Sequence, residues 1–103
     1  MIKVCVLYPN GPGATFNMQY YLASHMPMVR QVIGAALKGI GVDEGLGGGE
    51  PGSPPRYLAI GNLFFESLDA FQLAFATHGG PIVADIRNFT NTQPVIQIND
   101  VRM

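Results

Sequence analysis

The order of strand-like and helix-like segments constrains the fold of this sequence more than any other feature. Four segments have the β-branched and apolar composition of strands: residues 2–8, 38–46, 56–65 and 94–101. Two further segments, which begin near Asn17 and Ser67, repeat apolar residues at helical spacing. The order β-α-β-β-α-β predicts an α+β, ferredoxin-like βαββαβ sandwich with a four-stranded antiparallel sheet.

The first helix is expected to run from an Asn17 cap to Ile33, with Gly34 as its stop. Pro27 lies inside this pattern, where it has no N–H to donate and crowds the preceding turn. A kink or break is therefore expected near Met26, which gives the helix two segments. The side chains at core spacing in this helix are Leu22, Met26, Val29 and Ile33.

The second helix is expected to begin at a Ser67 cap and to end at Gly79 and Gly80. Pro81 is then well placed to open a short further helix that reaches Arg87. The glycine- and proline-rich stretch 47–55 between the two middle strands is predicted to be an irregular connection.

The length of 103 residues predicts one domain, residues 1–103, and the composition predicts that this domain has an apolar surface to cover. Hydrophobic residues make up 48% of the chain and charged residues 13%, against roughly 25% charged in a typical domain. Two helices can cover only one face of the predicted sheet, and large uncovered apolar surfaces usually mark an interface. We therefore expect a homodimer whose sheets pair face to face, with a pocket between or beside them.

Several classes of protein do not fit the sequence. Lysine and arginine residues form no cluster, so a nucleic-acid footprint is not predicted. No stretch approaches the roughly 18 apolar residues of a membrane span, and no leader pattern precedes the first strand, so we expect a cytoplasmic protein. Cys5 is the only cysteine and is expected to be a small buried hydrophobic residue. Neither a metal site nor a bound cofactor is predicted, because no metal-ligand pattern or phosphate-binding glycine motif is present. Haem needs only one axial imidazole, so the number of ligands does not rule it out, but nothing else in the sequence indicates it.

His25 is the first candidate for catalysis, with Tyr21 beside it. The two residues are four apart, so their side chains lie on one face of the predicted helix. An imidazole can accept or deliver a proton near neutral pH. The alternative is that His25 only bonds a backbone carbonyl freed by Pro27. Tyr20 and Tyr21 are candidates for a phenolic donor or an aromatic wall, although aromatic residues at helical spacing more often belong to the core.

Three other polar residues are candidates for ligand binding. His78 is expected at the end of the second helix, where a positive imidazole would interact favourably with the helix dipole. If it shared a cavity with His25, the two would form an acid and base pair. Asn62 and Gln97 interrupt apolar strands and either face solvent or bond a ligand inside a barrel; strand alternation does not choose between these.

The pattern Tyr20-Tyr21-x-x-x-His25-x-Pro27, after a strand and a loop, resembles the signature of the EthD (ethyl tert-butyl ether degradation) family. The likeness extends over nearly the whole chain, and its other parts are Leu7 to Pro9, Gly45 to Gly48 with Pro51 to Pro54, and Thr90 to Pro94. The resemblance implies a dimeric α/β barrel, a fold shared with polyketide cyclases, monooxygenases that need no cofactor and haem-handling proteins.

Two functional hypotheses follow from the residues and the resemblance. The first is a small enzyme or oxygenase-accessory protein that binds an apolar, aromatic or oxygenated small molecule in a barrel cavity, with lyase-like, cyclase-like or cofactor-free monooxygenase (oxidoreductase) chemistry. In it, His25 transfers the proton, Tyr21 orients the ligand and His78 supplies a second polar group. The second is a non-catalytic module that stores or senses a ligand or supports a partner oxygenase.

Overall fold

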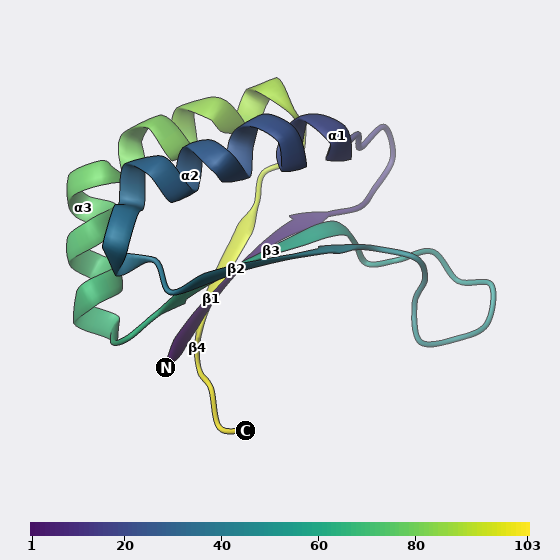
Figure 1. Cartoon of the computed structure of the whole chain (residues 1–103). Coiled ribbons are helices and arrows are strands. Elements are labelled where there is room, and N and C mark those ends of the chain that lie inside the picture. Colours follow the sequence, from purple (N-terminus) through teal and green to yellow (C-terminus); the bar gives the residue numbers. More distant parts are fainter.

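Helices lie on one face of a four-stranded antiparallel sheet in the computed structural model, which describes all residues 1–103 (Figure 1). The strands are β1 (Ile2–Pro9), β2 (Gly39–Glu44), β3 (Tyr57–Phe65) and β4 (Val95–Asp100), in the order β2-β3-β1-β4. The helices are α1 (Met18–Tyr20), α2 (Met26–Ile33) and α3 (Leu68–Asp85). The predicted α+β, ferredoxin-like arrangement is confirmed. No helix has the length and apolar character that crossing a membrane requires.

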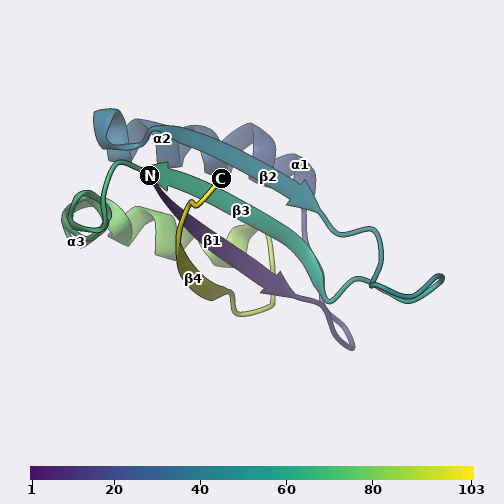
Figure 2. The same cartoon turned by 90° about the horizontal axis from the view of Figure 1, so that it is seen from below.

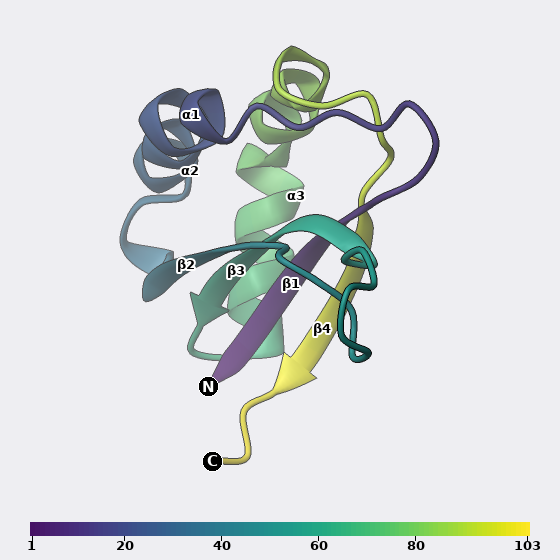
Figure 3. The ribbon, with the colours of Figure 1, turned by 90° about the vertical axis from the view of Figure 1, so that its right-hand side faces the viewer.

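The two faces of the sheet have different side chains because strand residues alternate between faces. On the central strand β1, Val4 lies opposite Leu63 of β3 and Ile98 of β4, and this row faces the helices. Cys5, the next residue, lies opposite Asn62 and Gln97 on the other face. That second face carries no helix, as the view from the side shows (Figure 3), so the hydrophobic core lies between the helices and one face only.

A π-helical turn, Tyr21–His25, joins α1 to α2. Asn17 caps α1 by accepting a hydrogen bond from the backbone N–H of Tyr20. Pro27 lies at the start of α2, where its missing N–H is tolerated. The predicted division near Met26 is present as a change from a π-helical to an α-helical segment, but the predicted kink or break was wrong, because the backbone stays helical through His25 and Met26.

The π-helical turn explains why one predicted core residue is on the surface. A wider turn shifts the face that the following side chains present. Tyr21, His25 and Met26 are buried, whereas Leu22 is 52% exposed. The prediction that Leu22 belongs to the core was wrong, while Val29 and Ile33 are buried as predicted.

Helix α3 continues without interruption past the residues predicted to end it. Gly79, Gly80 and Pro81 all lie inside the helix, so the predicted stop and the predicted separate short helix were wrong. Relative to alanine, a residue inside a helix destabilises that helix by about 1 kcal/mol if it is glycine and by about 3 kcal/mol if it is proline. Burial of Ile82 and Phe89 beyond them offsets this cost, and the continuous helix carries Asp85 to the π-helical turn.

The loop before α1 is fixed to the loop before β4. Thr90 donates from Oγ1 to the carbonyl of Thr15, and Asn91 accepts from the N–H of Thr15 and donates to the carbonyl of Gly13. The N–H of Asn17 donates to the carbonyl of Phe89. These bonds hold the start of the first helical segment against the end of α3. By contrast, residues 45–56 between β2 and β3 project beyond the sheet as the predicted irregular connection (Figures 1 and 2).

Candidate functional site

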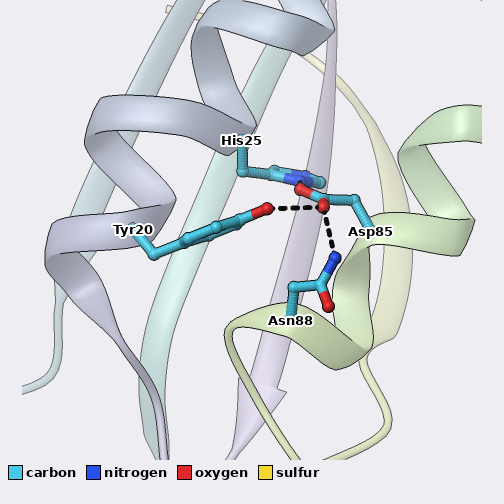
Figure 4. Close-up of polar contacts among 4 residues, drawn as sticks. All are labelled: Tyr20, His25, Asp85 and Asn88. Atoms are coloured by element: carbon cyan, nitrogen blue, oxygen red, sulfur yellow. Dashed lines mark hydrogen bonds and ion pairs between the residues drawn. The ribbon is translucent and has the colours of Figure 1, made fainter.

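A buried histidine and a carboxylate meet where the π-helical turn passes the end of α3. His25 is 2% exposed, and its Nδ1 lies 2.8 Å from Oδ2 of Asp85. The other oxygen, Oδ1, accepts hydrogen bonds from the Tyr20 hydroxyl at 2.7 Å and from Nδ2 of Asn88 at 2.9 Å. Figure 4 shows the three side chains converging on the carboxylate. Asp85 thus accepts hydrogen bonds from Tyr20 of α1, His25 of the π-helical turn and Asn88, which follows α3.

The imidazole of His25 is also fixed by aromatic rings. Tyr21 stacks on it with ring centroids 5.2 Å apart and planes 13° from parallel. Phe89, from the chain after α3, tilts against it at 4.6 Å. Tyr21 and Phe89 themselves meet at 4.9 Å. The predicted sharing of a helical face by Tyr21 and His25 is confirmed, and the two aromatic contacts restrict the orientation of the imidazole.

The protonation states follow from burial and hydrogen bonding. Burial lowers the pKa of His25, and the neighbouring Asp85 only partly opposes this. Burial would raise the pKa of the Asp85 carboxyl, but the hydrogen bonds from Asn88, His25 and Tyr20 outweigh it and hold that pKa below its ordinary value. Near neutral pH the pair is a neutral imidazole and a carboxylate. Since a carboxylate only accepts, Nδ1 carries the proton and Nε2 has a free lone pair.

Folding stability should fall as the solution is acidified through the histidine range. Because the pKa of His25 is lowered by folding, the unfolded chain binds a proton below about pH 6.5 that the folded chain does not. The free energy of unfolding is then highest and independent of His25 protonation above that pH. Below it, the free energy of unfolding decreases by at most about 1.4 kcal/mol per pH unit. Asp85, whose pKa is lowered from 3.8, adds a second decrease in stronger acid.

Urea unfolding as a function of pH measures this decrease. His25→Asn should flatten it, and His78→Asn, which changes the exposed histidine, should not. An unchanged slope in His25→Asn would show that the buried imidazole is not the group responsible.

His25 also borders a small cavity between the helices and the sheet. The cavity has a volume of about 50 Å³, and eleven of its thirteen lining residues are hydrophobic. Nε2 makes no hydrogen bond within the protein. Every polar side-chain atom that is fully buried does have a hydrogen-bond partner, so Nε2 is not fully buried. Nε2 therefore keeps some accessible surface beside the imidazole. An imidazole held in this way can accept a proton at Nε2 while its Nδ1–H remains bonded to the carboxylate.

Two phenols belong to the same lining. Burial raises the pKa of Tyr8 to about 12 and holds that of Tyr21 above its ordinary value, so both are protonated. The Tyr21 hydroxyl lies against Gly61 of β3, where a side chain would occupy its place. The hydroxyl of Tyr20 instead bonds Asp85, which raises the pKa of this phenol. Tyr21 thus lies beside the cavity, and Tyr20 beside the carboxylate.

The other predicted site residues lie elsewhere. His78 is exposed within α3 rather than at its end, and it does not line the cavity of His25. The prediction of its position was wrong because α3 does not stop at Gly79. The structure does not bring the two histidines together in one cavity.

Asn62 and Gln97 lie on the helix-free face of the sheet, which Figure 2 shows from below. Asn62 is buried, accepts from the Cys5 thiol at 3.3 Å and donates to Asp43 at 3.0 Å. Gln97 donates to Asn99, which in turn lies 3.2 Å from the Cys5 sulfur. Cys5 is half-buried within this polar row rather than fully buried as predicted. These residues are separated from His25 by the sheet.

Asp85 and Asn88 were not predicted as site residues. Asp85 is the sole acidic residue between Asp69 and Asp100 and interrupts the apolar run from Pro81 to Ile86. This isolated carboxylate in an apolar run was the sequence feature that could have marked it as a site residue. Its pairing with His25 depends on α3 being continuous. No group of three histidine, cysteine, aspartate or glutamate side chains is arranged to hold a metal ion.

Comparison with known proteins identifies the family. A model of the EthD domain matches residues 14–93, the part of the chain that includes His25, Asp85 and Asn88. This chain belongs to the EthD family. An EthD-like protein from Ralstonia eutropha JMP134 has a crystal structure that is similar with a TM-score of 0.93 and 40% sequence identity, over 99% of this chain and 92% of that one.

Two further proteins are more distantly similar to this chain. An uncharacterized 11.0 kDa protein in the thcB-thcC intergenic region of Rhodococcus erythropolis is 28% identical over 92 residues, which cover 88% of this chain and 85% of that protein. An ethyl tert-butyl ether degradation (EthD) family protein from Bacillus halodurans C-125 has a TM-score of 0.76 at 20% identity, over 99% of each chain. The last likeness shows the fold alone.

Proposed function

We propose that this EthD-family protein is a small enzyme that moves a proton on an apolar, aromatic or oxygenated molecule without a bound cofactor. The observation that carries the proposal is the 2.8 Å contact between Nδ1 of His25 and Asp85, which leaves Nε2 without a hydrogen bond in a side chain that lines an apolar cavity. A lowered histidine pKa keeps this base unprotonated at neutral pH. Tyr21, which stacks on the imidazole and lines the cavity, would orient the ligand.

The proposed step breaks a C–H or O–H bond of the ligand. The proton passes to Nε2, the bonding electrons remain on the ligand as an enolate or phenolate, and the Asp85 carboxylate stabilises the imidazolium that forms. A resonance-stabilised anion of this kind, which can react at carbon, is the intermediate from which lyase-like elimination, cyclisation or, with molecular oxygen as co-substrate, monooxygenation can proceed. Proton removal is therefore the activity to test first, since all three reactions share it.

Deuterium exchange into an uncharged aromatic ketone tests the proposal. The protein in D₂O should catalyse exchange of the α-hydrogens of acetophenone, which has no hydroxyl to compete for Nε2, and proton NMR measures the exchange. Because the base acts when unprotonated, the rate should rise with pH through a pKa below 6.5 and be flat above it. Exchange no faster than in buffer, over a panel of such ketones, would contradict the proposal.

A second candidate is the non-catalytic module, in which the domain delivers or senses a ligand or supports a partner oxygenase. The small cavity favours it, since about 50 Å³ is far less than the roughly 300–1,000 Å³ of typical ligand sites. This candidate predicts ligand binding without exchange, and unchanged binding when His25 is replaced.

We also propose that the protein forms a homodimer through the helix-free face of its sheet. Leu7, Ile60 and Val95 flank the polar row of Cys5 and Asn62 on that face and are only partly covered. An uncovered sheet face with apolar rows is typical of an interface.

A further inference from the structure

We propose that the cavity beside His25 takes an uncharged molecule that donates a hydroxyl hydrogen to Nε2, and that this molecule enters between Val83 of α3 and Ile96 of β4. The inference rests on the proposed function, because it concerns the same cavity. It adds the charge of the ligand, the group that the ligand presents to the base and the route to the site.

The lining of the cavity decides the charge. None of its thirteen residues is lysine, arginine, aspartate or glutamate. An anion that entered while the imidazole is neutral would leave water without meeting a cation, at a cost that effectively excludes it; an anion formed by proton transfer to Nε2 has the imidazolium beside it. The Asp85 carboxylate, on the Nδ1 side of the imidazole, would repel an anion further. An uncharged ligand meets neither obstacle.

The hydrogen bond between His25 and Asp85 decides the group that the ligand presents. With its proton held on Nδ1 by the carboxylate, the imidazole offers only an acceptor at Nε2. A ketone or ether oxygen would face this lone pair with another lone pair. A hydroxyl can donate to Nε2, and its oxygen can also accept from a protonated phenol such as Tyr8 or Tyr21, which share the lining.

Side-chain exposure around the cavity indicates the route. Val83 is 58% exposed and Ile96 is 54% exposed, and they are the only exposed residues of the lining. One comes from the last turns of α3 and the other from the edge strand β4, so they mark where the lining reaches solvent. At about 50 Å³ the cavity is smaller than a single ring, so the proposal requires that the ligand is small and that these two exposed side chains move aside as it enters.

Titration of the intact protein with three matched ring compounds tests the inference. Phenol has the hydroxyl, anisole carries a methyl ether in its place, and benzoate is an anion. Dissociation constants are followed by NMR, together with the nitrogen shift of His25 Nε2. Phenol should bind about tenfold more tightly than anisole, the difference of one hydrogen bond to an otherwise unpaired acceptor, and benzoate should not bind. The Nε2 shift should move with phenol alone.

Substitutions at the entrance test the route. Val83→Trp should weaken phenol binding, while Leu73→Trp, at a site that is 73% exposed on the same helix but outside the lining, should not. Equal affinity for phenol and anisole, or binding of benzoate, would overturn the ligand class. Normal phenol binding by Val83→Trp would overturn the route.

These outcomes are separate from those of the proposed function. Selective phenol binding by a protein that exchanges no α-hydrogen would support the ligand class and contradict the catalysis. Exchange without any preference for phenol would support the catalysis and overturn this inference.

Discussion

His25→Asn should lower the rate of α-hydrogen exchange by at least about 100-fold, the usual contribution of a positioned general base. The asparagine amide can place an N–H where Nδ1 now lies and keep the hydrogen bond to Asp85, but it has no atom in place of Nε2. The substitution therefore removes the base while it preserves the contact that joins the π-helical turn to α3. Exchange assays at saturating ketone measure the effect directly.

Asp85→Asn gives the matched test of orientation. In the native protein Oδ1 accepts from Tyr20 and Asn88, and Oδ2 accepts from His25. In Asp85→Asn one of these oxygens is replaced by an NH₂ group, which then faces a residue that also donates. Where the amide faces His25, the imidazole must carry its proton on Nε2, which blocks the base. We expect a rate loss together with a switch of the His25 tautomer in nitrogen NMR, which a purely structural role would not produce. For the first variant, α-hydrogen exchange by His25→Asn at the rate of the original protein would remove His25 from the mechanism.

Gly61→Ala should lower the free energy of unfolding by about 1–3 kcal/mol, the usual cost of overpacking a core. A methyl group at this position would fall on the Tyr21 hydroxyl and 3.1 Å from Cε of Met26. Both neighbours belong to the buried core, so neither can move aside freely. Chemical denaturation of the variant and the original protein measures the difference.

Two further variants show whether the contact with Tyr21 is the cause. Gly41→Ala lies on the adjacent strand, where the new methyl group would meet Asn62 at an ordinary 3.6 Å, and it should change stability little. Tyr21→Phe removes the hydroxyl, so Gly61→Ala should cost less in the Tyr21→Phe background than alone. Equal costs in both backgrounds would show that the hydroxyl is not what excludes a side chain at Gly61.

The sequence by itself determined the architecture. Strand-like runs with period two and helical runs with period near four give the β-α-β-β-α-β order, and these local patterns arise from the geometry of the backbone. The same reasoning placed Tyr21 beside His25, since residues four apart share a helical face. The family could be recognised from the Tyr20 to Pro27 pattern, and the match to residues 14–93 confirmed it.

Tertiary structure alone decided the partner of His25 and the surroundings of its imidazole. Local signals end a helix at Gly79, yet burial of Ile82 and Phe89 outweighs the propensities of two glycines and a proline and carries α3 on to Asp85. His25 and Asp85 are 60 residues apart in the chain, and no periodicity relates residues at that separation. Their contact depends on how two helices pack over one sheet, and so does the cavity, whose volume is what the packed side chains leave unfilled.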